Sequence, residues 1–193
     1  YIKVSQAEGN EPPYSKADIQ ECIKHVVDVN WGDKTDIAPD IKMTMENAGH
    51  ILGSSSVYMQ IGEGKSEHRL LFSGDIKYEK SWLFDAATVR FPKVDTLVIE
   101  STYGGPQSIQ PTRHQASQEL QDLVSDTLSR KGKIFCPVFA VGRSQEVMLA
   151  IDELFKSGRV PPVTVWLDGM ISEASAIHSL SLIHISEPTR HRR

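Results

Sequence analysis

Three side chains that can bind a metal or move a proton, each ending or following an apolar strand-like run, constrain this chain more than any other feature. Residues 47–54 contain His50, residues 71–75 end in Asp75, and residues 97–104 contain Glu100. Asp75 follows His50 by 25 residues, and Glu100 follows Asp75 by another 25. Imidazole and carboxylate groups at strand ends are common metal ligands. The pattern therefore predicts a metal site at the rim of a β-sheet.

Taken singly, none of the three residues is specific. His50 alone could be a structural histidine hydrogen-bonded in its loop. Asp75 follows a glycine, as many turn residues do, and Glu100 alone could cap a helix or turn. The conjunction of all three, each after its own strand, favours the metal site over these separate structural roles.

Composition narrows the class of protein. With 39% hydrophobic and 24% charged residues, the chain fits a soluble globular protein of one domain or parts of two. No apolar run approaches the roughly 20 residues of a membrane-spanning helix. The two cysteines lack a metal-type spacing and indicate a reducing compartment, so we expect a cytoplasmic protein. A net charge of −4 means that any contact with nucleic acid must come from a local basic patch.

The chain changes character near residue 104. Before it, a capping box at Ser15 and Asp18 predicts a helix, and period-two alternation then predicts short strands. The strands are expected at residues 41–45, 57–61, 69–73 and 95–99, with a hairpin turn at 62–65. After it, helices are expected at 114–130, 142–156 and 171–177, with buried strands at 134–139 and 163–167 between them. Alternating helix and strand predicts α/β layers around a parallel sheet.

Six segments together carry a resemblance to a known family. The chain resembles the metallo-β-lactamase-fold nucleases of the β-CASP group, and most of all the archaeal relatives of the cleavage and polyadenylation specificity factor nuclease. The resemblance covers nearly the whole chain up to His178 and lies in residues 11–15, 47–54, 73–75, 99–105, 137–146 and 166–170.

The resemblance implies an α/β fold with two incomplete domains. Residues 1–104 would form the C-terminal part of the first half of a metallo-β-lactamase αββα sandwich. Residues 105–178 would begin the α/β β-CASP domain. The resemblance also implies an upstream His-x-His-x-Asp-His cluster and two later histidines, and neither stands in this sequence. We therefore expect an inactive fragment of a longer enzyme.

The resemblance also assigns roles to single residues. His50 would ligate one of two zinc ions, and Asp75 would bridge both. Glu100 would partner a histidine that protonates the leaving oxygen, which makes these three the catalytic candidates. Arg143 begins a helix and could contact RNA phosphate, although an ordinary surface arginine is an equal alternative.

The function implied is that of a zinc-dependent ribonuclease in RNA 3′-end processing or transcription termination. It would act as an endonuclease, with 5′–3′ exonuclease action left open, and its partners would be RNA and a second copy in a homodimer, with no membrane. Two alternatives stay open: a non-catalytic paralogue that binds RNA or scaffolds a complex, and another hydrolase of the same fold. Fold by itself does not decide between them.

The two ends of the chain carry one further expectation. The sequence begins at Tyr1, and residues 180–190 resemble the translation of a common sequencing adapter. We expect residues 179–193 to be a non-native tail, which fold arguments should leave out. A native amphipathic tail is the alternative.

Overall fold

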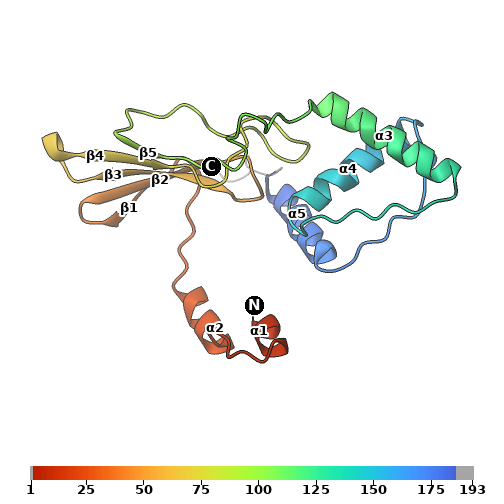
Figure 1. Cartoon of the computed structure of the whole chain (residues 1–193). Helices are drawn as coiled ribbons and strands as arrows, with labels where there is room; N and C mark the ends of the chain where they lie inside the picture. Colours follow the sequence, from red (N-terminus) through yellow and green to blue (C-terminus); the bar gives the residue numbers. More distant parts are fainter. Residues whose placement is uncertain (1, 186–193) are drawn as a thin grey trace, which may run out of the picture.

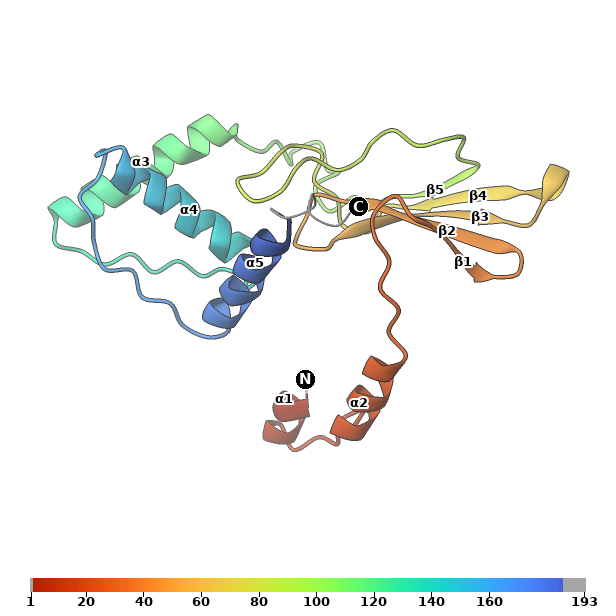
Figure 2. The same ribbon diagram turned by 180° about the vertical axis from the view of Figure 1, so that it is seen from behind.

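The computed structural model describes residues 2–185, so Tyr1 and residues 186–193 lie outside the described residues, as does most of the expected tail. Figure 1 shows a small helical arm, a β-sheet, and a group of helices beyond one end of the sheet. Seen from behind in Figure 2, the arm again stands away from the sheet on a long connection.

The sheet has five strands that follow one another in chain order. Its order is β1-β2-β3-β4-β5, with antiparallel pairing up to β4 and parallel pairing of β5 with β4. A 3₁₀ turn, η1 (Gly64–Ser66), lies between β3 and β4 and confirms the expected hairpin. The strands are β1 (Lys34–Ala38), β2 (Ile41–Asn47), β3 (Ser55–Ile61), β4 (His68–Phe72) and β5 (Thr96–Val98).

Among the described residues, the buried side chains of the sheet lie on one face. Tyr58 and Leu71 are buried on that face, and the Tyr58 ring stacks on Phe91, with 6.3 Å between ring centroids. The opposite face carries Met43, Met59 and Leu70, which lie in register across three strands. Within residues 2–185 no second sheet packs on that face. The fold is therefore mixed α/β with one sheet, and the two-sheet sandwich stays a prediction.

The N-terminal arm consists of α1 (Ile2–Ala7) and α2 (Lys16–Lys24). The capping box is confirmed: the Asp18 backbone N–H donates to Ser15 Oγ at 3.2 Å, and the Ser15 N–H donates to Asp18 Oδ2 at 2.7 Å. These bonds satisfy backbone donors that the first helical turn leaves free.

The helical group consists of α3 (Arg113–Ser129), α4 (Arg143–Lys156) and α5 (Ile171–Ile185), which confirms the three expected helices. Val124, Leu154 and Val160 form its small buried core, and partly buried neighbours pack around them. The apolar spacing of α3 and α4 explains this packing, because residues three and four apart share one helix face.

The two strands expected between these helices are wrong. Residues 133–139 and 161–168 form no strand, and Phe135 and Trp166 are 90% and 89% exposed. A strand of a parallel sheet needs hydrogen-bonding neighbours and cover on both faces. Neither is present among the described residues. After residue 104 the described structure therefore contains helices and extended segments, and not the expected α/β layers.

Candidate metal and phosphate site

The ends of three strands meet at one edge of the sheet. Asn47 at the end of β2 pairs with Ser55 at the start of β3. The start of β3 in turn lies beside the end of β4, and the end of β4 beside that of β5, because Phe72 pairs with both Val57 and Val98. The segments that follow β2, β4 and β5 therefore leave the sheet together. These are the segments that carry His50, Asp75 and Glu100.

The loop that carries His50 is held by the side chains of Ser54 and Asn47. The N–H groups of His50 and Ile51 both donate to Ser54 Oγ, at 3.0 and 3.1 Å. Asn47 accepts from the Gly49 N–H at 2.8 Å and donates its amide to the Ala86 carbonyl at 3.2 Å. The His50 ring thus stands on a fixed turn and not on a free loop.

His50 and Asp75 approach each other across the sheet edge. Nε2 of His50 lies 3.9 Å from Oδ2 of Asp75, and the two side chains are 40% and 72% exposed. Both groups are therefore open to solvent and to a ligand, and a single ion could bind both. The structure thus brings together two of the residues that the sequence singled out. Their role as metal ligands stays a prediction.

Of the three candidate side chains at this edge, that of Glu100 is the most tightly held. Its Oε1 accepts a hydrogen bond from the Ile76 N–H at 2.8 Å, and its own N–H donates to Ser73 Oγ at 3.1 Å. Hydrogen bonding by Thr102 and then by the Ile76 N–H lowers the pKa of Glu100, and the charge of nearby His50 lowers it further. Glu100 is therefore a fixed carboxylate, ionised at neutral pH, beside the imidazole.

The donor set fits zinc by type but not by number. Zinc takes histidine nitrogen and carboxylate oxygen, in a tight site of about four donors. In the part of the chain that the structure describes, no group of three or more His, Cys, Asp or Glu side chains is arranged to hold a metal ion. His50 and Asp75 could contribute two donors, and the remaining ones would have to come from elsewhere.

Arg143 lies close to this edge although it belongs to the helical group. It is the first residue of α4, and its exposed guanidinium donates through Nη1 to Glu146 Oε2 at 2.8 Å. A methyl group at Gly142 would lie 3.0 Å from Cγ2 of Ile51, so the start of α4 touches the His50 loop. Arg143 is thus placed near the candidate metal ligands, and its contact with phosphate stays a prediction.

Lys77 and Glu146 belong to the surroundings of this site, and sequence reasoning did not single them out. Lys77 Nζ lies 3.6 Å from Glu146 Oε1. Glu146 stands inside the family-like segment 137–146, which was a usable signal. Lys77 follows Asp75 by two residues and carries no signal of its own.

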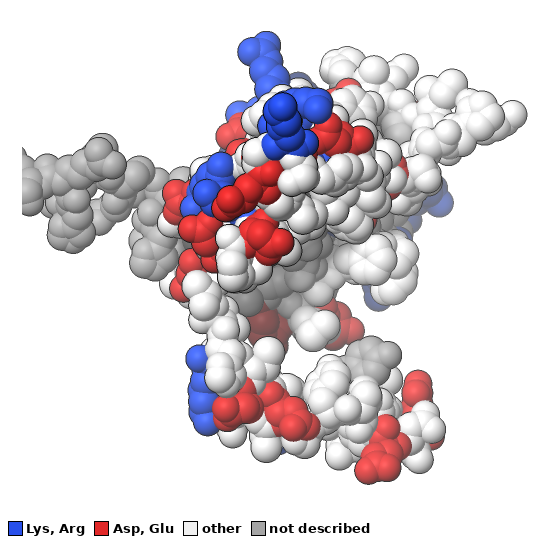
Figure 3. Space-filling model, turned by 90° about the vertical axis from the view of Figure 1, so that its left-hand side faces the viewer, with Lys and Arg blue, Asp and Glu red and all other residues white. Residues whose placement is uncertain are grey.

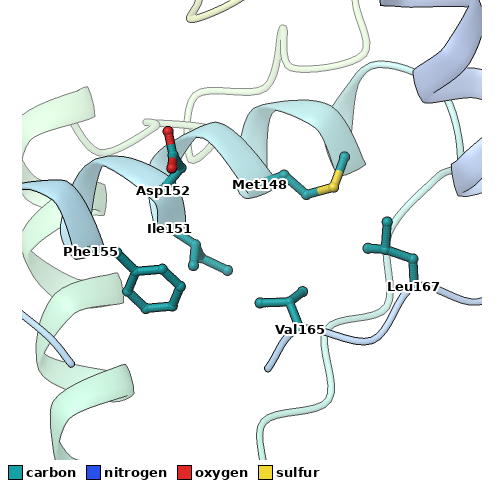
Figure 4. A pocket seen from close by; sticks show the side chains of 6 residues that line it. All are labelled: Met148, Ile151, Asp152, Phe155, Val165 and Leu167. Atoms are coloured by element: carbon teal, nitrogen blue, oxygen red, sulfur yellow. The ribbon is translucent and has the colours of Figure 1, made fainter. Parts of the chain in front are cut away.

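Other surfaces offer weaker candidates. An open pocket of about 250 Å³ lies between α4 and residues 165–167; five of its six lining residues are apolar and the sixth is Asp152 (Figure 4). Lacking a basic group, it does not suit a phosphate.

Seen from the hairpin end of the sheet, lysines and arginines are interspersed with acidic residues (Figure 3). Within residues 2–185, every helix is too short or too polar to cross a bilayer.

The chain is similar to curated proteins named transcription termination factor FttA. It is 44% identical to that of Lokiarchaeum sp. over 192 residues, which are 100% of this chain and 30% of that protein. It is 47% identical to that of Methanosarcina mazei over 179 residues, 93% of this chain and 28% of that protein. It is 44% identical to that of Thermococcus kodakarensis over 190 residues, 98% of this chain and 29% of that protein. No protein-family model matches the chain.

The chain therefore spans about 30% of the length of the curated relatives it matches. This partial coverage fits the expectation of a piece of a longer protein. The relatives named here are archaeal, which agrees with the archaeal branch of the family that the sequence as a whole resembles.

Proposed function

Because the chain belongs to the family of the archaeal transcription termination factors FttA over the segment that it shares with them, we propose that it is part of an archaeal, zinc-dependent ribonuclease that acts in transcription termination. The intact protein would cut RNA as an endonuclease and work in the cytoplasm as a homodimer. The observation that carries this proposal is the convergence of His50, Asp75 and Glu100 at one sheet edge.

The chemistry follows from the state of each group. His50 and Asp75 are exposed donors 3.9 Å apart, which suits them to hold a shared zinc site. Zinc held by these two residues, together with donors from elsewhere, would act as a Lewis acid that activates water and stabilises the charge on phosphate oxygens. Glu100 stays ionised because its oxygens accept hydrogen bonds, so it can orient an imidazole and favour the protonated form of that ring. A histidine so held could deliver a proton to the leaving oxygen.

The start of α4 would hold the RNA backbone. Arg143 donates to Glu146 but remains exposed, and a guanidinium has further N–H donors for a phosphate. The first turn of α4 faces the same loop that carries His50. RNA bound there would run past the candidate metal ligands.

Cleavage by the intact protein tests this proposal. His50→Ala and Asp75→Ala should each lower the cleavage rate more than about 100-fold. Removing a metal ligand should cost more activity than removing a residue that only hydrogen-bonds to a ligand. RNA binding should change by less than about threefold, since most of it comes from phosphate contacts. Asp85→Ala is the matched control, because its exposed carboxylate pairs with Lys80 at 2.9 Å.

Retention of cleavage in either variant would contradict the assignment of the site. A wild-type protein that binds RNA without cutting it would instead support the non-catalytic scaffold. The upstream coding sequence offers an independent check, since an intact His-x-His-x-Asp-His cluster favours the enzyme and a decayed one favours the scaffold.

A further inference from the structure

Glu146 is a nearly buried acid between two cations that come from different parts of the chain. Its side chain is only 14% exposed, and Oε2 accepts the hydrogen bond from Arg143 in its own helix. Its other oxygen, Oε1, is buried, has no hydrogen-bond partner among the described residues, and lies 3.6 Å from Lys77 Nζ. A buried carboxylate oxygen is costly unless a charge compensates it. Lys77 is the group that provides this compensation from beyond α4.

Lys77 is also the point where the two metal-site segments are joined. Its N–H donates to the carbonyl of Ala48 at 2.9 Å, two residues before His50. Its own carbonyl accepts from the Ala87 N–H at 2.8 Å. Because Lys77 follows Asp75 by two residues, its main chain connects the Asp75 segment with the His50 loop. The position of the Lys77 side chain therefore affects both the Asp75 segment and the His50 loop.

A second contact lies beside the first. Gly142, at the start of α4, packs so closely on Ile51 that a methyl group there would approach Cγ2 to 3.0 Å. Ile51 is the neighbour of His50 in the sequence. The first turn of α4 therefore meets the site twice, through an ion pair at Lys77 and through close packing at Ile51.

We propose that Glu146 is a positioning residue that fixes the His50 and Asp75 segments relative to each other through its ion pair with Lys77. Ion pairs that are shielded from solvent are screened less than exposed ones, and loss of one partner leaves the other charge uncompensated. Ligands of a metal must be held to within about 0.5 Å for a productive site. The consequence for catalysis rests on the proposed function, whereas the mechanical link does not.

Hydrogen exchange of this chain tests the link directly. Glu146→Gln keeps the shape of the side chain and removes its charge. Amide exchange in residues 48–53 and 74–80 should become about threefold to tenfold faster, as expected for losing one charge-assisted contact. Glu153→Gln is the matched control, because Glu153 is an exposed residue of the same helix. Exchange in α3 serves as an internal reference.

A double-mutant cycle shows whether the effect passes through Lys77. Lys77→Met should reproduce the faster exchange, and the double variant should be no faster than either single variant. Three results would overturn the proposal: unchanged exchange in Glu146→Gln, additive effects of the two substitutions, or a rise that extends equally to α3. The last would mean general loss of structure and not positioning.

The intact protein adds a readout specific to the site. Glu146→Gln should lower kcat and zinc affinity by about tenfold, as loss of a group supporting a ligand does, while KM for RNA stays within about twofold. Unchanged kcat with faster exchange would contradict a catalytic consequence. If the wild-type protein cuts no RNA, the proposed function fails, and the exchange experiment still decides the positioning role.

Discussion

Gly49→Ala is the substitution whose cost can be worked most fully from the structure. Gly49 has φ +68°, a conformation that side chains rarely adopt, and its Cα faces backbone on three sides. A methyl group there would lie 2.7 Å from the Lys77 carbonyl oxygen and 2.8 Å from both Ala87 N and the Asp85 carbonyl oxygen. Gly53 in the same loop provides the control, with φ +75° and nothing within 4 Å.

The two substitutions share one cost and differ in another. The left-handed conformation costs a residue with a side chain about 1–2 kcal/mol, and this applies to both. Only Gly49→Ala forces a methyl group against backbone atoms that cannot rotate away, which costs about 1–3 kcal/mol more. The free energy of unfolding should therefore fall by about 1–2 kcal/mol in Gly53→Ala and by about 2–5 kcal/mol in Gly49→Ala.

Urea unfolding followed by tryptophan fluorescence measures this difference. With a slope of about 2 kcal/mol per molar urea, Gly49→Ala should unfold roughly 0.5–1.5 M earlier than Gly53→Ala. Trp31 reports on the sheet edge, because its Nε1 donates to Ser55 Oγ at 2.9 Å. Equal midpoints for the two variants would refute the tight packing of Gly49 against Lys77 and Ala87.

Two further predictions concern charge and packing. The pKa of Glu100 lies below its ordinary value of 4.5, so its carboxylate stabilises the fold above about that pH and the benefit is lost as pH falls through the lowered pKa. Glu100→Gln should therefore lower the urea midpoint at pH 7 and converge with wild type in acid; a constant difference would refute this. Leu154→Ala should cost about 2–5 kcal/mol in urea unfolding because Leu154 is 1% exposed. Leu149→Ala, at an exposed position of the same helix, should cost less than about 1 kcal/mol, and equal costs would contradict the core.

Local chemistry made part of this structure predictable from the sequence. The Ser15 and Asp18 capping box marked the start of α2, because the bonds concerned span only three residues. Period-two alternation located β2 and β3 for the same reason. The meeting of His50, Asp75 and Glu100 followed from the motifs, once neighbouring strands were known to pair.

Features that depend on distant partners were not predictable in this way. The strand expected at residues 134–139 has a suitable pattern but no neighbour to bond with among the described residues. Conversely, β1 was missed because Asp36 and polar neighbours hide its alternation, and only pairing with β2 defines it. The ion pair of Lys77 with Glu146 joins residues 69 positions apart, and no local pattern encodes such a contact.

The zinc content of the intact protein, measured by mass spectrometry of the purified metalloprotein, tests the central claim most directly. We predict two zinc ions per chain in the wild type, a clear loss in His50→Ala and Asp75→Ala, and no loss in Asp85→Ala. The 193-residue chain alone should hold neither ion tightly, because it offers two of about four donors. Full zinc content in both ligand variants, or two tightly bound ions in the chain alone, would contradict the account.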